Sequence, residues 1–320
     1  MTIAHKTGFF SHPDCRKHDM GRGHPECPER LDAIEDWLLA TGVMDALDRH
    51  DAPLAALAPI ELAHSEAHVS LVNELNRRLQ DSIASGGARL AQIDPDTAMS
   101  AGSFNAILRG VGAALAATDA VMAGELENAF CATRPPGHHA CRDKAMGFCV
   151  FNNVAIAAKY ALAQHGLARV AIIDFDVHHG NGTEDIVAGD DRILMASFYQ
   201  HPFYPYGGST SQAANLVNLP VPAYTKGPAV RALVEQYWLP RLHAHQPEMI
   251  FISAGFDAHR DDDLGQMGLV EADYAWLTQQ IKAIAKLYSQ GRIVSCLEGG
   301  YNLGALGRSV EAHVRVLADV

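Results

Sequence analysis

The sequence predicts an α/β fold in which helices flank a central parallel β-sheet. Short apolar runs alternate along the chain with longer amphipathic stretches, and this alternation is typical of a parallel sheet wound by crossover helices. The run 170–174 is apolar and largely β-branched up to its final aspartate, as expected of a strand buried on both faces of such a sheet. No linker-like, repeated or low-complexity segment interrupts the pattern, so we expect one domain over residues 1–320.

The predicted elements follow this alternation in chain order. A first helix is expected over 28–42, because proline is tolerated in the first turn and glycine commonly ends a helix. Amphipathic periodicity predicts helices over 65–82 and 99–124, with a polar loop at 93–97 between them. The later strands are expected at 129–133, 170–174, 193–198, 249–254 and 293–297, and the later helices at 153–166, 228–245, 271–290 and 303–318.

Composition narrows the classes of protein to which the chain can belong. The net charge of −12 argues against direct nucleic-acid binding, which needs basic patches, and suits cationic substrates better. We find no secretory signal and no apolar run long enough to cross a bilayer, so no membrane association is expected. The six cysteines are scattered, which fits free thiols in a reducing compartment. We therefore expect a cytoplasmic protein.

The residues after the 170–174 run change abruptly from apolar to polar. In an extended chain Asp174, Asp176 and His178 point the same way, because side chains alternate with a period of two. Carboxylates and an imidazole oriented together where a strand meets a loop are typical of a metal site. A strand end with solvated charges is the alternative, but it explains poorly an Asp-x-Asp-x-His-His run followed by a glycine turn.

Polar or glycine-rich sequence follows the other predicted strands as well. In a parallel sheet the carboxyl ends of the strands share one edge, so we expect these distant segments to meet there. Asp176, His178 and Asp257 would give three nitrogen and oxygen ligands and leave a position open for water, as catalytic zinc sites do. Hard carboxylates also admit iron, manganese or cobalt, so the ligand types predict the site better than the metal.

Two adjacent histidines and a tyrosine are the candidate catalytic groups. His138 and His139 follow two prolines and a glycine, a stiff turn that could aim both rings at a water on the metal. Asp174 and Asn181 are the candidate partners that orient these rings, and their difference in charge should keep one imidazole more basic than the other. Tyr301 follows two glycines and could donate a hydrogen bond to the oxyanion of a tetrahedral intermediate.

A second group of possible zinc ligands lies near the N-terminus. These residues are Cys15, His18, His24 and Cys27. Their spacing matches no zinc-finger pattern and no compact ββα or ribbon pattern surrounds them. We expect a long loop that lines another part of the molecule instead.

Five motifs in order resemble those of the zinc-dependent histone deacetylase and acetylpolyamine amidohydrolase family, most closely its class II branch, which includes bacterial members. They are RPPGHH at 134–139, GFC at 147–149, DFDVHHGNGT at 174–183, SAGFD at 253–257 and LEGGYN at 297–302. The likeness extends from the His24-Pro25 loop to the last predicted helix. It implies a three-layer arginase/deacetylase-like fold and a catalytic domain that removes acetyl or other acyl groups from amines.

The resemblance implies the catalytic roles. One catalytic Zn2+ would be bound by Asp176, His178 and Asp257. His139 would be the general base, His138 its electrostatic or acid partner, and Tyr301 would polarise the scissile carbonyl.

The resemblance also implies surrounding residues. A structural K+ is expected near the strand ends, largely through backbone carbonyls, at Asp174, Asp176, His178, Ser197 and Phe198. Asn181 would orient His139 without a charge, where class I members carry an aspartate. Phe148 and Phe198 would flank a tunnel for the acyl-lysine chain, and Asp94 or Asp96 would clamp the substrate.

One position bears on the choice of substrate. Polyamine-selective relatives carry a glutamate just before a Gly-Gln-Met sequence, and here that place is Leu264. An apolar residue cannot form the ion pair that would select a cationic polyamine. We therefore predict acylated lysine in proteins or peptides, with acetylpolyamines or other small acylated amines as the alternative. The sequence leaves open whether the chain forms a homo-oligomer.

Two other classes of protein are weighed against this prediction. An arginase-type ureohydrolase shares the fold but needs a binuclear manganese cage with more carboxylates than these strand ends supply. A non-enzymatic acyl-lysine or metal-binding module would have no use for Tyr301, His138 and His139 together.

Overall fold

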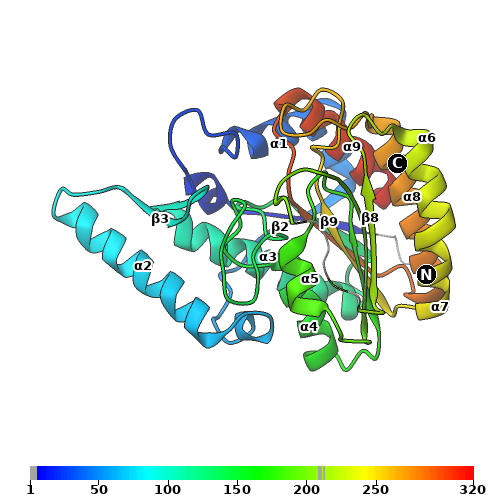
Figure 1. The fold of residues 1–320 in the computed structure, drawn as a ribbon, viewed down its shortest axis with the longest axis horizontal. Helices are drawn as coiled ribbons and strands as arrows, with labels where there is room; N and C mark the ends of the chain where they lie inside the picture. The colour runs from blue at the N-terminus through cyan, green and yellow to red at the C-terminus, as the bar shows by residue number, and fades with distance from the viewer. Residues whose placement is uncertain (1–5, 208–210, 212) are drawn as a thin grey trace.

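Side chains along strand β6 (Val170–Asp174) alternate between two hydrophobic layers, and all five residues are buried. Ala171 and Ile173 pack into one cluster, and Ile172 packs into the other. A strand buried on both faces needs helices on both sides of its sheet. The computed structural model in Figure 1 shows this three-layer arrangement, and it describes residues 6–207, 211 and 213–320.

The central sheet has eight strands in the order β2-β1-β5-β10-β9-β6-β7-β8. Every neighbouring pair is parallel, which confirms the predicted α/β fold with a central parallel sheet. The strands other than β6 are β1 (Thr7–Ser11), β2 (Leu47–Asp51), β5 (Asn128–Cys131), β7 (Ile193–Gln200), β8 (Leu216–Val221), β9 (Met249–Ala254) and β10 (Ile293–Leu297).

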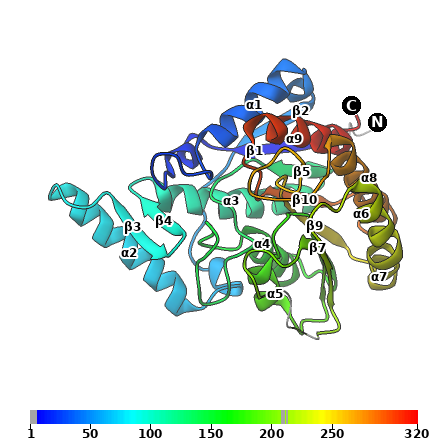
Figure 2. The ribbon, with the colours of Figure 1, turned by 45° about the horizontal axis from the view of Figure 1, so that its top comes forward.

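Helices cover both faces of this sheet (Figure 2). One face carries α1 (Glu29–Ala40), α6 (Gly227–Leu233), α7 (Leu239–His245), α8 (Glu271–Tyr288) and α9 (Leu303–Ala318). The other face carries α3 (Ser103–Met122), α4 (Asn153–Gln164) and α5 (Asn181–Val187). The buried residues of α2 (Glu66–Ala84) join the hydrophobic cluster on this side.

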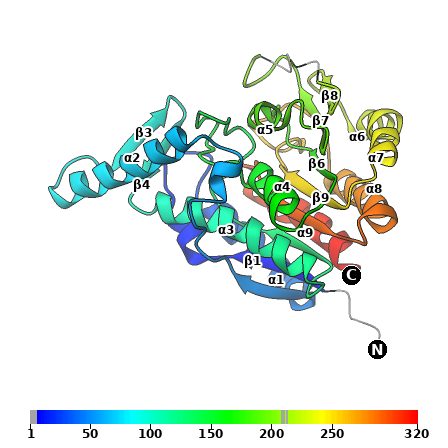
Figure 3. The ribbon, with the colours of Figure 1, turned by 90° about the horizontal axis from the view of Figure 1, so that it is seen from below.

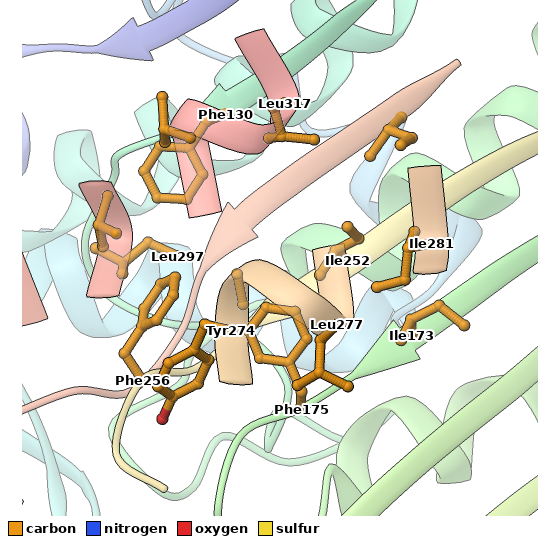
Figure 4. Close-up of a cluster of buried hydrophobic side chains, with 14 of the residues drawn as sticks. Phe130, Ile173, Phe175, Ile252, Phe256, Tyr274, Leu277, Ile281, Leu297 and Leu317 are labelled. Carbon is orange, nitrogen blue, oxygen red and sulfur yellow. The ribbon is translucent and has the colours of Figure 1, made fainter. Parts of the chain in front are cut away.

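The hydrophobic cluster on the α8 and α9 side lies directly beneath the carboxyl ends of the central strands. Phe175 and Phe256, each just past a strand end, contact each other with ring centroids 5.9 Å apart. Both rings also pack on Tyr274 of α8 (Figure 4). The loops that follow β6 and β9 therefore start from a rigid, fully buried base.

Helix α2 and a small antiparallel hairpin extend away from the sheet (Figures 2 and 3). The hairpin consists of β3 (Leu90–Asp94) and β4 (Thr97–Ser100). The prediction of a loop at 93–97 missed the flanking strands, and the following helix begins at Ser103 instead of residue 99. Strand β3 is partly exposed along its whole length, and although most of β4 is buried it is only four residues long, so neither strand carries a long hydrophobic pattern.

Strands β1, β2 and β8 were not predicted. Strands β2 and β8 form the two edges of the sheet, and they mix buried, half-buried and exposed residues with no continuous apolar run. Pro220 lies within β8, a residue that cannot donate to a neighbouring strand and is confined to edges.

The helix predicted over 228–245 consists of α6, a π-helical turn at Val234–Trp238, and α7. Pro240 lies in the first turn of α7. Because proline has no N–H to donate to the preceding turn, the regular hydrogen-bond ladder is interrupted, and the wider turn accommodates the break.

Among the residues that the structure describes, no helix is both long and apolar enough to span a membrane.

Candidate metal centre and active site

Three side chains from two neighbouring strand ends meet at the carboxyl edge of the sheet. Asp176 and His178 follow β6, and Asp257 follows β9, which pairs with β6 in parallel. Each residue offers one ligand atom within 4.8 Å of the other two. His178 Nδ1 lies 2.9 Å from Asp176 Oδ1 and 3.2 Å from Asp257 Oδ2. The register of the parallel pair thus produces a compact set of one nitrogen and two carboxylate ligands.

These ligands fit a divalent metal ion. Asp257 Oδ2 is buried and accepts no hydrogen bond, which is costly unless a cation or donor faces it. Burial, and next the nearby charge of Asp176, raise the pKa of Asp257 to about 7. A Cβ atom on Gly255 or Gly299 would collide with these carboxylates, so glycine keeps the space around them open.

Backbone amides orient the two carboxylates. Asp176 accepts hydrogen bonds from the N–H of His178 at 2.8 Å and of Gly299 at 2.9 Å. Asp257 Oδ1 accepts one from Val177 N at 2.9 Å. Because one oxygen of Asp257 is fixed by the backbone, its other oxygen is directed toward His178.

The His138-His139 turn places two differently polarised imidazoles beside this cluster, with ring centroids 4.1 Å apart. His138 Nδ1 lies 3.0 Å from Asp174 Oδ2, whereas His139 Nδ1 lies 2.7 Å from the amide oxygen of Asn181. Burial opposes the charge on His138, but the carboxylates of Asp176 and Asp174 outweigh it and raise the pKa of His138 well above 6.5. Burial and then the neighbouring His138 lower the pKa of His139 well below 6.5. The surroundings of the two rings therefore shift their pKa values in opposite directions.

Glu298 fixes the backbone of that turn, a role that the sequence did not reveal. Its Oε2 accepts hydrogen bonds from Gly137 N at 2.6 Å and His138 N at 3.0 Å. Its Oε1 accepts one from the Ser253 hydroxyl at 3.0 Å. The sequence signal for this role was weak: Glu298 directly follows the apolar strand β10 within the LEGGYN motif, and the sequence analysis gave it no role.

Tyr301 is held at the site by a second buried carboxylate that the sequence analysis also missed. Asp262 Oδ2 accepts hydrogen bonds from Tyr301 N at 2.6 Å and Asn302 N at 3.0 Å. Its Oδ1 accepts one from Leu264 N at 2.9 Å. Burial raises the pKa of Tyr301 well above 10, so the phenol keeps its proton and remains a hydrogen-bond donor.

The N-terminal loop supports the site through buried ion pairs. Glu26 pairs with the guanidinium groups of Arg134 and Arg30. Arg30 also donates to Gly300 O at 2.7 Å, and its guanidinium lies 4.9 Å from the centre of the Tyr301 ring. The loop that carries Cys15, His18, His24 and Cys27 thus borders the site, with the His24 ring edge-on to Phe148 at 4.7 Å.

The tunnel prediction for Phe198 is wrong. Phe198 is 1% exposed and stacks on Trp238 in the hydrophobic core, with ring centroids 5.6 Å apart. Strand β7 continues to Gln200, so Phe198 lies inside the strand. Its side chain packs into the hydrophobic cluster on the face of the sheet that α6, α7, α8 and α9 cover. Phe203 instead stacks on His178 at 5.4 Å, and Tyr204 contacts the His139 ring edge-on at 5.1 Å.

Three other residues singled out by the sequence are Phe148 at the tunnel, Leu264 at the position that bears on substrate choice, and Ser197 near the expected K+. Phe148 is half-buried, and its ring lies edge-on to Tyr301 at 6.0 Å. Leu264 is half-buried in the loop that Asp262 holds. The position of Ser197 is fixed by its hydroxyl, which donates to Asn218 Oδ1 at 2.7 Å.

The two predicted clamp residues lie at the turn of the β3–β4 hairpin. Asp96 Oδ1 accepts hydrogen bonds from Gly147 N at 3.0 Å and the Thr97 hydroxyl at 2.7 Å. Asp94 pairs with Lys144 at 3.2 Å. Both carboxylates therefore connect the hairpin to the 141–149 loop next to the His138-His139 turn, and their role as a substrate clamp stays a prediction.

Comparison with known proteins gives a consistent result. The family model of the histone deacetylase domain matches residues 24–317. The histone deacetylase-like amidohydrolase of Pseudomonas aeruginosa is 36% identical over 287 residues, which are 88% of this chain and 73% of that protein. Type-2 histone deacetylase 2 of Dictyostelium discoideum is 41% identical over 250 residues, which are 70% of this chain but only 14% of that much longer protein. The crystal structure of the HDA15 HD domain matches with a TM-score of 0.90 at 30% identity, over 98% of this chain and 90% of that one.

Proposed function

Since this chain belongs to the histone deacetylase family, we propose that it hydrolyses the acyl amide of lysine side chains in proteins or peptides. The observation that carries this proposal is the meeting of Asp176, His178 and Asp257 with the His138-His139 turn at one edge of the sheet. We propose that residues 1–320 act as one catalytic domain.

We also propose that the protein works in a reducing, cytoplasmic environment. The free state of all six cysteines supports this location.

The metal centre would hold one zinc ion through Asp176, His178 and Asp257. When bound there, zinc polarises a carbonyl group and acidifies water. A separate K+ near Asp174 and Ser197 would have a structural role only.

The side chains around the centre would carry the proton transfers. His139 is neutral and its Nδ1 faces Asn181, so its Nε2 is free to take a proton from the attacking water. His138, whose Nδ1 lies beside the Asp174 carboxylate that helps to raise its pKa, would supply positive charge beside the developing oxyanion. Tyr301, which keeps its phenol proton, donates a hydrogen bond to the carbonyl oxygen in the transition state. The protonated His139 then returns its proton to the leaving amine as the C–N bond breaks.

The choice of acyl-lysine over acylated polyamine depends on Leu264. In a competition assay with zinc-loaded protein, acetyl-lysine peptides should be cleaved in preference to acetylpolyamines and other small acylated amines. Leu264→Glu should shift this preference toward acetylpolyamines by about tenfold or more, because a carboxylate at the rim would pair with the distant ammonium. Leu264→Gln, of matched size but uncharged, should not. Polyamines preferred by orders of magnitude in the wild-type protein would overturn the assignment, and two manganese ions per chain would favour a ureohydrolase.

Asp262 is expected to be a positioning residue for Tyr301. Asp262→Asn leaves one acceptor oxygen for the three backbone N–H groups that the carboxylate now binds. The Tyr301 phenol would then lose its fixed orientation, and kcat should fall by roughly 10- to 100-fold. Zinc content should not change. Asp263→Asn removes the same charge from an exposed neighbour in the same loop and is the control. Equal loss in both variants would contradict the positioning role.

A further inference from the structure

The orientation of Asn181 decides which nitrogen of His139 carries a proton. A carboxamide has nearly the same shape at both ends, so either its oxygen or its NH2 group can face the ring. With the oxygen facing His139 Nδ1 at 2.7 Å, Nδ1 must be the protonated nitrogen and Nε2 is the free base. With the amide reversed, Nδ1 would accept a hydrogen bond and Nε2 would carry the proton.

Two sulfur atoms face the other end of this amide. Asn181 Nδ2 lies 3.4 Å from Cys141 Sγ and 3.4 Å from Met146 Sδ. A thioether has no hydrogen, so Met146 can only accept a hydrogen bond. An amide oxygen turned toward Met146 would face sulfur lone pairs, whereas the NH2 group finds an acceptor there.

Cys141 closes the arrangement into a ring of hydrogen bonds. Its thiol lies 3.7 Å from the carbonyl oxygen of His139, to which it donates. The ring therefore runs from His139 Nδ1–H to Asn181, from the Asn181 NH2 to the Cys141 sulfur, and from the Cys141 thiol to the His139 backbone. Burial raises the pKa of the Cys141 thiol to about 11, which keeps the proton that this last contact needs.

The backbone holds both sulfur-bearing residues in place. Cys141 N donates to Lys144 O at 2.9 Å, and Met146 N donates to Cys149 O at 3.0 Å, in two consecutive turns. Gly147, next to Met146, lies so close to the His139 ring that a Cβ atom there would collide with it. The sulfur atoms are thus part of a fixed loop that packs against His139.

We propose that Cys141 and Met146 are positioning residues that fix the orientation of the Asn181 amide and thereby keep Nε2 of His139 unprotonated. This inference rests on the proposed role of His139 as the general base. It assigns to the sulfur pair a task that a carboxylate at position 181 would not need, because both ends of a carboxylate are acceptors.

The test uses a double variant that carries both Cys141→Ala and Met146→Leu. Its effect on kcat is measured in two backgrounds, the natural Asn181 and the variant Asn181→Asp. With Asn181, kcat should fall by about three- to tenfold with little change in KM, because the amide can then reverse. With Asn181→Asp, the same double change should alter kcat by less than about twofold, since a carboxylate has no orientation to lose. Cys141→Ser should restore most of the activity lost in Cys141→Ala, and Cys27→Ala controls for removal of a half-buried thiol that is not part of this ring of hydrogen bonds.

Ring 15N NMR of the zinc-loaded protein gives a readout that does not depend on turnover. The His139 signals, assigned by their loss in His139→Gln, should show a protonated Nδ1 in the natural protein and a mixture of tautomers in the double variant. Equal losses of kcat in both backgrounds, or unchanged tautomers, would show that the sulfur atoms only fill space. A natural protein that shows this tautomer but cleaves no acyl amine would contradict the proposed function and leave this inference standing.

Discussion

Replacement of Tyr301 by phenylalanine is expected to lower kcat by roughly 10²- to 10³-fold, the usual effect of removing one oxyanion donor. The ring should keep its place, since its contacts with Arg30 and Phe148 and the backbone bonds to Asp262 do not involve the hydroxyl. KM should change little, because the phenol acts most strongly on charge that develops in the transition state.

Metal analysis and a matched variant separate this effect from damage to the fold. Zinc per chain and the unfolding temperature of Tyr301→Phe should equal those of the natural protein. Tyr288→Phe removes a hydroxyl from α8 that contacts only His243 among the hydrogen bonds of the described residues, and it should keep full activity. Near-full activity of Tyr301→Phe would remove that residue from the mechanism.

The second large effect is expected at Asp257. After dialysis, the natural protein should retain one zinc ion per chain and Asp257→Asn nearly none. The activity of the variant should be lower by at least about 10³-fold. The reason is geometric, because the backbone fixes Oδ1 on Val177 N and leaves Oδ2, which accepts no hydrogen bond, as the ligand atom. An amide in its place is a neutral and much weaker ligand.

Stability gives an independent measurement of this loss. Added zinc should raise the unfolding temperature of the natural protein, since a ligand that binds only the folded state stabilises it. It should leave that of Asp257→Asn unchanged, whereas the exposed control Asp263→Asn should respond as the natural protein does. A stoichiometric zinc ion in Asp257→Asn would show that the centre lies elsewhere.

The position of a strand in the sheet explains why some strands were not predicted from the sequence. The central strands β6, β9 and β10 are buried on every residue, so their apolar runs stand out in the sequence. Strands β2 and β8 lie at the edges of the sheet and mix buried with exposed residues. Phe198 was placed at a strand end for a different reason: the apolar run becomes polar after it, although β7 continues two residues further and is buried throughout.

The sequence by itself determined the parallel sheet and the residues that follow each central strand, since burial and side-chain alternation leave a local pattern. Only the tertiary structure decided how these residues are held. Asp262 binds Tyr301 N from 39 positions away, Glu298 binds Gly137 N across 161, and Asn181 contacts Cys141 across 40. Hydrogen bonds between distant loops depend on how the strands are ordered in the sheet, and no local pattern of residues encodes that order.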